Sequence, residues 1–324
     1  MPDQPLISDL KTGDTLLGYF LATDAAYKTT RNGSEYLELK LMDASGELKA
    51  FLWDLKAVEG EYSDIAPDVF VKVKGRVEEF QGRRQVRVDK VRFAPDAEVG
   101  DFSHFFPTSR RPVEGMLQEL DGLVQGIRDP WIRKLLEAML VLDADRRAGL
   151  AKAPAAKSLH HVYLGGLLEH TLSVAGMAQR ACEHYRDLNR DLVLAGVLLH
   201  DLGKTAELSY QRSFGYTDAG NLLGHITLEA QWVAKAIEAL PGFPEELRLQ
   251  ILHIVLAHHG KLEFGSPVLP KTPEALLVHY LDDLDGKLEG MFHLMAEESG
   301  QGNWSAWSRA LDRPVYKTRW PSSL

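Results

Sequence analysis

Hydrophobic and polar residues alternate with a period of two along most of the first 95 residues, where β-branched and aromatic residues are frequent. This alternation is typical of strands that bury one face. It predicts a first strand that begins near Leu16, a hairpin formed by residues 36–42 and 47–53, and a second pair of strands at residues 69–77 and 85–93. Turn residues separate the members of each pair. Residues 1–95 are therefore expected to form a domain of five short strands.

Five short strands joined by hairpins, without a long helix, indicate a small β-barrel of the OB type. Alternation assigns the inward positions to six residues: Leu37, Leu39, Leu41, Leu48, Ala50 and Leu52. The outward positions on the second and third strands are Tyr36, Lys40, Lys49, Phe51 and Trp53. OB-folds bind oligonucleotides on these strands, and aromatics beside lysines suit stacked bases and a phosphate backbone. The alternative is that Phe51 and Trp53 simply pack against a second domain.

Positive charge is concentrated in one part of this domain. Between residues 71 and 93 there are eight Lys or Arg against three acids, although the whole chain has a net charge of −9. Phosphate binding needs local positive potential, so Lys49, Lys72 and Lys74 are candidate contacts for single-stranded RNA. The alternative is a solvated strand face whose lysines protect a sheet edge.

Helical periodicity replaces the alternation from Val113 onward. Apolar residues spaced by three and four predict helices at residues 113–127, 131–142, 167–185, 192–199, 227–240, 245–256 and 274–292. An all-α domain is thus expected over residues 113–300. Residues 96–112, with their prolines and aromatic cluster, are expected to form a partly docked linker, and residues 301–324 a tail packed on one of the domains.

Composition narrows the protein class only a little. A chain of 324 residues with 45% hydrophobic content is long enough for two domains with their own cores. Its single cysteine, Cys182, has no partner for an internal disulfide, and no run of eighteen uncharged apolar residues occurs. The N-terminus also lacks the features of a signal peptide. These properties predict a cytoplasmic protein without a membrane partner, and they are compatible with a homo-oligomer.

Seven His and Asp residues lie within or next to apolar helical stretches of the second half. They are His170, His200, Asp201, His225, His258, His259 and Asp282. Imidazoles and carboxylates bind catalytic divalent metals. A single buried histidine is readily explained as a core residue, but adjacent His200 and Asp201 cannot both enter a dry core without partners. A shared metal site would satisfy all seven.

The pattern His…His-Asp…Asp resembles the signature of the HD-domain metal-dependent phosphohydrolases, and the additional histidines resemble the variant that holds two metal ions. The segment from Ala155 to Thr171, with Leu223-Gly224-His225-Ile226 and Ala257-His258-His259-Gly260, is similar to the YhaM-type 3′→5′ exoribonucleases. That family carries an OB-fold ahead of an HD domain. By this resemblance Asp282 takes the terminal ligand position. Asp285 shares its helix face and is the second choice, whereas Asp283 is expected to be solvated.

Ligands of nitrogen and oxygen without thiolate favour Mn²⁺, with Mg²⁺ or Fe²⁺ as alternatives, and two ions are expected. His200, Asp201 and Lys204 are the expected catalytic residues. Lys204 would contact a phosphate oxygen of the substrate, although a helix-terminal lysine that interacts with the helix dipole is the alternative. The resemblance makes His160 and His161 part of the active-site wall, with a substrate contact as their expected role. A loop position without such a role is equally compatible.

Three functions fit these observations. The first is a 3′→5′ exoribonuclease that releases nucleoside monophosphates from single-stranded RNA, with single-stranded DNA as a further possible substrate. The second is a phosphohydrolase of a small nucleotide, such as a dNTP, a cyclic nucleotide or an alarmone, with a regulatory OB domain. The third is a non-catalytic RNA-binding protein with a structural metal site. The complete set of candidate ligands argues against the third function.

Overall fold

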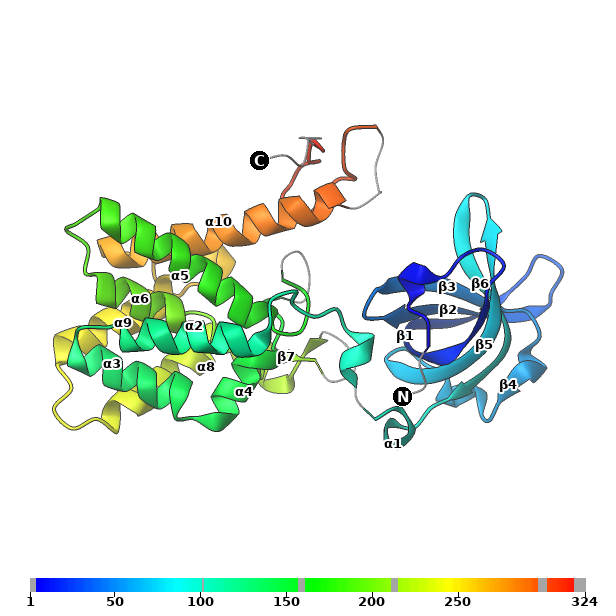
Figure 1. Ribbon diagram of the computed structural model, residues 1–324, viewed down its shortest axis with the longest axis horizontal. Helices are drawn as coiled ribbons and strands as arrows, with labels where there is room; N and C mark the ends of the chain where they lie inside the picture. Colours follow the sequence, from blue (N-terminus) through cyan, green and yellow to red (C-terminus); the bar gives the residue numbers. More distant parts are fainter. Residues whose placement is uncertain (1–3, 101, 157–160, 211–214, 297–301, 318–324) are drawn as a thin grey trace. The chain divides into compact units, whose positions relative to one another are not determined.

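The computed structural model describes residues 4–100, 102–156, 161–210, 215–296 and 302–317 (Figure 1). The chain divides into two compact units; the first runs as far as Thr108 and also includes Tyr210, and the second contains the other described residues from Ser109 onward. The first unit is built from strands and the second from helices.

A closed β-barrel forms the first unit. Its long strands are β1 (Thr15–Thr29), β2 (Glu35–Asp43), β3 (Gly46–Leu52), β5 (Val69–Phe80) and β6 (Arg83–Phe93). They follow the order β3-β2-β1-β5-β6, and the short strand β4 (Val58–Glu59) pairs with β6. Parallel pairing of Ala50 with Val86 and of Phe51 with Arg87 closes the barrel between β3 and β6. The predicted five-stranded OB-type barrel is confirmed.

Alternation along β2 and β3 determines which side chains fill the barrel. The six residues expected to point inward are all buried, namely Leu37, Leu39, Leu41, Leu48, Ala50 and Leu52. Their neighbours in sequence face outward, where Tyr36 and Phe51 are half-buried and Trp53 is exposed. The pattern of side-chain burial therefore confirms the predicted faces of both strands.

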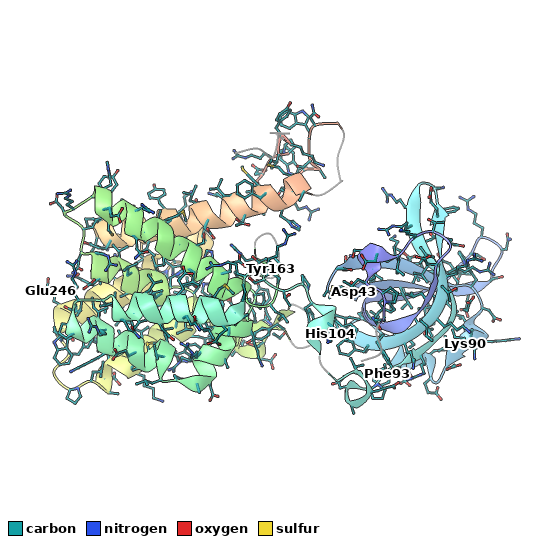
Figure 2. All side chains as sticks on the ribbon, in the orientation of Figure 1. Asp43, Lys90, Phe93, His104, Tyr163 and Glu246 are labelled. Atoms are coloured by element: carbon teal, nitrogen blue, oxygen red, sulfur yellow. The ribbon has the colours of Figure 1, made fainter. Side chains whose placement is uncertain are left out.

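Segments on either side of the strands complete the barrel. The carboxylate of Asp43, which is labelled in Figure 2, accepts a hydrogen bond from the backbone N–H of Ile7 at 2.7 Å. After β6 come α1 (Asp96–Val99) and a 3₁₀ turn (Phe102–Phe105). Phe105 is buried, and its ring centroid lies 4.7 Å from that of Phe70. As far as Thr108, the expected linker is thus part of the first compact unit.

Helices make up the second unit around one buried helix, α6 (Arg190–Leu199), which is apolar on all sides from Leu192 onward. The helices α3 (Pro130–Leu136), α5 (Gly166–His184), α9 (Glu245–Ala257) and α10 (Pro273–Ala296) contact it. The outer elements are α2 (Val113–Gln125), α4 (Ala144–Lys152), α7 (Lys204–Glu207) and α8 (Asp218–Glu238), with a small ribbon of β7 (Leu208–Ser209) and β8 (Gly215–Tyr216). The expected all-α character of this domain is confirmed apart from this ribbon.

Three helical details differ from the expectation. Periodicity did not predict α4, because Leu150 is its only buried residue. The helix α8 begins at Asp218 rather than at residue 227, and a non-helical residue, Gly224, interrupts it. Residues 137–141 form a π-helical turn instead of continuing α3 as an α-helix. Within the described residues, no helix combines the length and the apolar character needed to cross a membrane.

Candidate metal centre

Side chains from five helices and one turn converge at the centre of the helical unit. His170 lies within α5, His200 ends α6, and His258 ends α9. His225 follows the interruption in α8, and Asp282 lies in the middle of α10. The structure thus brings together residues that are separated by more than one hundred positions in the sequence.

The candidate ligands form two groups that share Asp201. One group contains His170, His200, Asp201 and Asp282, and the other contains Asp201, His225, His258 and His259. In each group, one potential ligand atom per residue lies within 4.8 Å of the others. The Oδ2 atom of Asp201 lies 3.3 Å from His200 Nε2, and its Oδ1 atom lies 3.6 Å from His225 Nε2. One carboxylate therefore presents one oxygen to each group.

All five histidines of the two groups are held through their Nδ1 atoms. His200 Nδ1 lies 2.8 Å from the carbonyl oxygen of Val197, and His258 Nδ1 lies 2.7 Å from that of Val255. The other three Nδ1 atoms lie 2.7–3.0 Å from an oxygen: His170 faces the carboxylate of Asp285, His225 faces that of Glu207, and His259 faces the carbonyl oxygen of Phe264. Because a carbonyl oxygen only accepts hydrogen bonds, the Nδ1 atom facing it must donate, and Nε2 keeps its lone pair for a metal.

Several buried polar atoms at the centre have no hydrogen-bond partner among the described residues. They include Asp201 Oδ1, His225 Nε2 and His258 Nε2, and all three belong to the second group. An unsatisfied buried polar atom costs about 1–3 kcal/mol, so three that face one another need a common partner. A divalent cation is such a partner for nitrogen and oxygen donors, and the residues present therefore fit a metal ion.

Charges around Asp201 keep its carboxylate ionised. Burial by itself would raise the pKa of Asp201, but Lys204 and His200 hold that pKa well below its usual range. The ammonium of Lys204 lies 2.7 Å from Asp201 Oδ2. Burial lowers the pKa of Lys204, and the attraction of Asp201 more than offsets this effect, so that this pKa is raised. The lysine is consequently a fixed positive charge at the edge of the first group.

Asp282 and Asp285 hold different positions relative to His170. Asp282 Oδ1 lies 3.2 Å from His170 Nε2, on the side of the ligand groups. Asp285 contacts Nδ1 on the opposite side of the same ring and also faces His161 Nε2 at 3.3 Å. This geometry favours Asp282 as the ligand and gives Asp285 the task of orienting His170. Asp283 instead forms an ion pair with Lys287 at 2.6 Å.

His161 is buried in a hydrogen-bonded chain beside the metal centre. Its Nδ1 atom lies 2.7 Å from the hydroxyl oxygen of Tyr163, which donates to Glu169 at 2.8 Å. The contact of His161 with Asp285 links this chain to His170. A substrate contact of His161 stays a prediction. His160 lies outside the described residues, so its predicted role is likewise untested.

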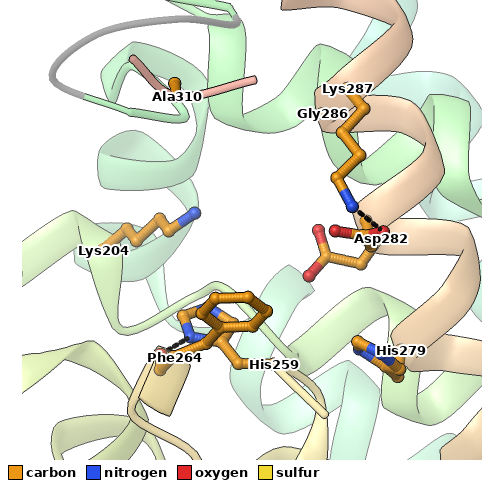
Figure 3. A pocket seen from close by; sticks show the side chains of 9 residues that line it. Lys204, His259, Phe264, His279, Asp282, Gly286, Lys287 and Ala310 are labelled. Carbon is orange, nitrogen blue, oxygen red and sulfur yellow. Dashed lines mark hydrogen bonds and ion pairs between the residues drawn. The ribbon is translucent and has the colours of Figure 1, made fainter. Parts of the chain in front are cut away.

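A pocket of about 440 Å³ opens beside the candidate ligands (Figure 3). Lys204, His259 and Asp282 connect it to the metal centre. Figure 3 shows Lys204 and Lys287 on opposite sides of the pocket, where Lys287 is paired with Asp283, with Phe264 and His259 along another wall. Pockets for small ligands measure roughly 300–1,000 Å³. This one has room for a group the size of a nucleotide between two ammonium groups.

Residues proposed for RNA contact on the barrel form one aromatic cluster. The ring of Trp53 lies 4.8 Å from that of Tyr36 and 5.8 Å from that of Phe51, and both pairs are stacked. Lys49 is exposed on the same strand as Phe51, although it lies 3.4 Å from a carboxylate oxygen of Glu38. The aromatic cluster, Tyr36, Phe51 and Trp53, is therefore a continuous stacking surface with a lysine at its side.

The two remaining candidate lysines lie farther around the barrel, on β5. Lys72 donates a hydrogen bond to the hydroxyl of Tyr19 at 3.1 Å, whereas Lys74 is exposed. The strand β6 separates β5 from β3. Arg87 on β6 pairs directly with Phe51 on β3. On its other side, Arg87 pairs with Arg76 on β5. These two arginines are closer in register to the aromatic cluster than Lys72 and Lys74 are.

Several residues around the metal centre were not identified from the sequence. Glu207 accepts hydrogen bonds from both the backbone N–H (3.1 Å) and the ring of His225, and Glu229 is fully buried near Gly203. Burial raises the pKa of Glu229 well above its usual range. Gly203 is required at its position because a Cβ atom there would overlap the carbonyl oxygen of His225. No motif marked Glu207 or Glu229; only their distance of a few positions from predicted ligands could have drawn attention to them.

Metal stoichiometry tests the shared carboxylate. We expect two ions per chain in the unaltered protein, about one after Asp282→Ala, and almost none after Asp201→Ala, because only Asp201 belongs to both groups. The measurement is metal content after equilibration with Mn²⁺ and gel filtration. Asp283→Ala is the matched control. Asp283 is next to Asp282 in the sequence, but its carboxylate pairs with Lys287, so this substitution should leave both ions bound. Equal losses from Asp201→Ala and Asp283→Ala would contradict the proposed ligand groups.

Comparison with known families supports the division into two functional parts. Residues 23–94 match the model of an OB-fold nucleic acid binding domain, and residues 167–287 match the model of the HD domain. Similar solved structures include a domain of replication protein A from Methanococcus maripaludis, with 22% identity over 28% of this chain and 92% of that chain and a TM-score of 0.24. Another is the HD domain of the phosphodiesterase PgpH from L. monocytogenes, with 21% identity over 45% of this chain and 74% of that chain and a TM-score of 0.29.

At such low identities and TM-scores, these two solved structures carry no argument about the fold or function of this chain. The family matches agree with the closed barrel and with the His and Asp residues gathered in the helical unit. The chain therefore carries an OB-type barrel followed by a helical HD domain.

Proposed function

We propose that the protein is a metal-dependent 3′→5′ exonuclease that acts on single-stranded RNA. The observation that carries this proposal is the pair of ligand groups sharing Asp201 at the edge of a pocket that also contains Lys204. A phosphodiester placed in that pocket would lie next to both groups and to a fixed positive charge. Single-stranded DNA is a further possible substrate, because stacking and phosphate contacts occur in both polymers.

Two divalent ions would be held by the groups described above, with Mn²⁺ as the first choice and Mg²⁺ or Fe²⁺ as alternatives. When bound, such ions lower the pKa of a water molecule and neutralise charge on a phosphate. Asp285 and Glu207 keep His170 and His225 oriented through their Nδ1 atoms. The ammonium of Lys204 would bind a non-bridging phosphate oxygen as a point charge. His200 and Asp201 complete the expected catalytic set.

The dimensions of the pocket support attack at a chain end. A volume of about 440 Å³ accepts a terminal nucleotide, whereas an internal duplex segment would not fit. The direction from 3′ to 5′ rests on the resemblance to the YhaM-type enzymes. The aromatic cluster Tyr36, Phe51 and Trp53 supplies a surface on which other bases of a single strand would stack.

Hydrolysis of a small nucleotide is the second candidate function, and the same pocket volume favours it. In that case the barrel would serve as a regulatory module. Incubation with Mn²⁺ and either a labelled oligoribonucleotide or a panel of dNTPs, cyclic nucleotides and alarmones separates the two functions. Turnover of one small nucleotide without degradation of RNA would favour the second candidate.

Removal of the shared carboxylate should abolish hydrolysis. We expect Asp201→Ala to lower turnover by several orders of magnitude while the circular dichroism spectrum persists, because both ligand groups lose a member. The rate is measured on an oligoribonucleotide with Mn²⁺ present. Activity within about tenfold of the unaltered protein corresponds to only ~1.4 kcal/mol of activation barrier and would mean that the site is not catalytic.

The polarity of degradation is tested with blocked ends. A free 3′ end on a single strand should be degraded, whereas a 3′-phosphate or a blunt duplex should be degraded poorly, because the end must enter the pocket. Products are resolved on a denaturing gel with label at the 5′ end. Degradation of a circular RNA at an equal rate would show internal cleavage and would rule out an exonuclease.

The aromatic cluster should contribute to the binding of long RNA but not to hydrolysis. Phe51→Ala and Trp53→Ala are expected to weaken binding by roughly 1–3 kcal/mol per lost stack, while cleavage of bis-nitrophenyl phosphate stays unchanged. Phe80→Ala is a matched control, since its side chain is also exposed on the barrel. If melting temperature falls strongly and all substrates are affected equally, these rings are structural residues rather than an RNA-binding surface.

A further inference from the structure

Residues 302–317, near the end of the described chain, fold back on themselves and are named here the C-terminal loop. Isolated bridges join Trp304 to Tyr316 and Ser308 to Arg313. The backbone N–H of Val315 donates to Ser305 Oγ at 2.9 Å, which ties the two sides together. Ser305, Ser308, Leu311 and Val315 are buried. The loop therefore has one covered side and a defined shape.

The other side of the C-terminal loop presents aromatic rings to solvent. Trp304 and Tyr316 cover each other in an edge-to-face pair with their centroids 5.0 Å apart. Trp307 is 63% exposed and forms no hydrogen bond or ring contact with any residue in the described ranges. Trp304 and Tyr316 are also exposed, at 50% and 49%, so this short loop presents three aromatic side chains to solvent, and an exposed apolar patch indicates an interaction site.

The charge of the C-terminal loop is opposite to that of the chain. It contains Arg309, Arg313 and Lys317 against Asp312, in a protein with a net charge of −9. Arg309 is exposed and adjacent to Ala310. Exposed indole beside guanidinium groups is the combination that binds single-stranded nucleic acid through base stacking and phosphate pairing. An acidic partner without rings would use only the positive charge, and a purely apolar partner would use only the indole.

The loop also borders the pocket of the candidate metal centre. Ala310 lines this pocket together with Lys204 and Lys287, and Figure 3 shows it across the pocket from Phe264. Trp307 precedes Ala310 by three residues, a separation that spans at most ~11 Å of backbone. Trp307 is therefore within reach of the first one or two nucleotides of a strand whose end lies in the pocket.

We propose that the C-terminal loop is a binding site for single-stranded nucleic acid next to the reacting phosphodiester, with Trp307 stacking on a base and Arg309 pairing with a phosphate. This inference rests on the proposed function, because it places the strand end in the pocket beside Asp201. It adds a substrate contact within the helical unit that is separate from the aromatic cluster on the barrel. Short substrates that occupy only the pocket and its border should already depend on it.

The test compares Trp307→Ala and Arg309→Gln with two controls of matched exposure on α5 or its end, Tyr185→Ala and Arg180→Gln. Oligoribonucleotides of two, three, four and eight residues and bis-nitrophenyl phosphate serve as substrates with Mn²⁺. Trp307→Ala should raise the KM for the tetranucleotide by about 5-fold to 150-fold, the range for one lost base stack. Turnover of bis-nitrophenyl phosphate and the melting temperature should remain as in the unaltered protein.

A binding measurement makes failure of this inference distinguishable from failure of the proposed function. A labelled phosphorothioate tetranucleotide is titrated with the unaltered protein and with each variant, and the Kd is read from fluorescence anisotropy. Binding that Trp307→Ala weakens supports the loop even if RNA hydrolysis is absent and the proposed function fails. An unchanged Kd and KM in Trp307→Ala, or equal losses with bis-nitrophenyl phosphate and the tetranucleotide, would overturn the inference. Equal losses would identify Trp307 as a structural residue of the pocket wall.

Discussion

The ionised carboxylate of Asp201 is the constraint on which the helical unit depends. Its side chain is almost completely buried, and burying a charge without partners is prohibitive in an apolar core. Lys204 supplies one partner, and the Nε2 atoms of His170, His200, His225 and His258 face the remaining directions, where a divalent ion would supply the missing positive charge. The surrounding helices must therefore hold their relative positions, because a displaced helix would withdraw a ligand atom from the space around this charge.

The histidines around Asp201 are held in orientations that suit a metal ion. Each ring in the two groups is held at Nδ1 by an oxygen, so its Nε2 atom is available toward the centre. A site held in this way is ready to bind metal without rearrangement of its ligands. Gly203 contributes by letting the backbone of His225 approach the turn after α6. Packing and chemistry are thus satisfied by the same contacts.

The sequence was most informative where a simple period governs the structure. Alternation predicted the strands around Leu39 and Ala50, and spacing by three and four predicted the long helices. It failed where local contacts outweigh periodicity, as in α4 with one buried residue and in α8 with the break at Gly224. The predicted ligands do lie together, but the sequence indicates Asp285 only as a second choice of ligand and gives Glu207 no signal, because their roles in orienting histidines arise only when distant helices meet.

The positions of two histidines in the metal centre depend on the lengths of the helices that they end. His200 and His258 end α6 and α9, and each ring contacts the carbonyl oxygen three residues earlier in its own helix. Carbonyl groups in the last turn have no partner within the helix, so helix termination itself creates the acceptor. One inserted residue in either helix would rotate the following side chains by about 100° and move them by about 1.5 Å. We therefore expect natural variation in length to be confined to the connections between helices, while α6 and α9 keep a fixed number of residues before their terminal histidines.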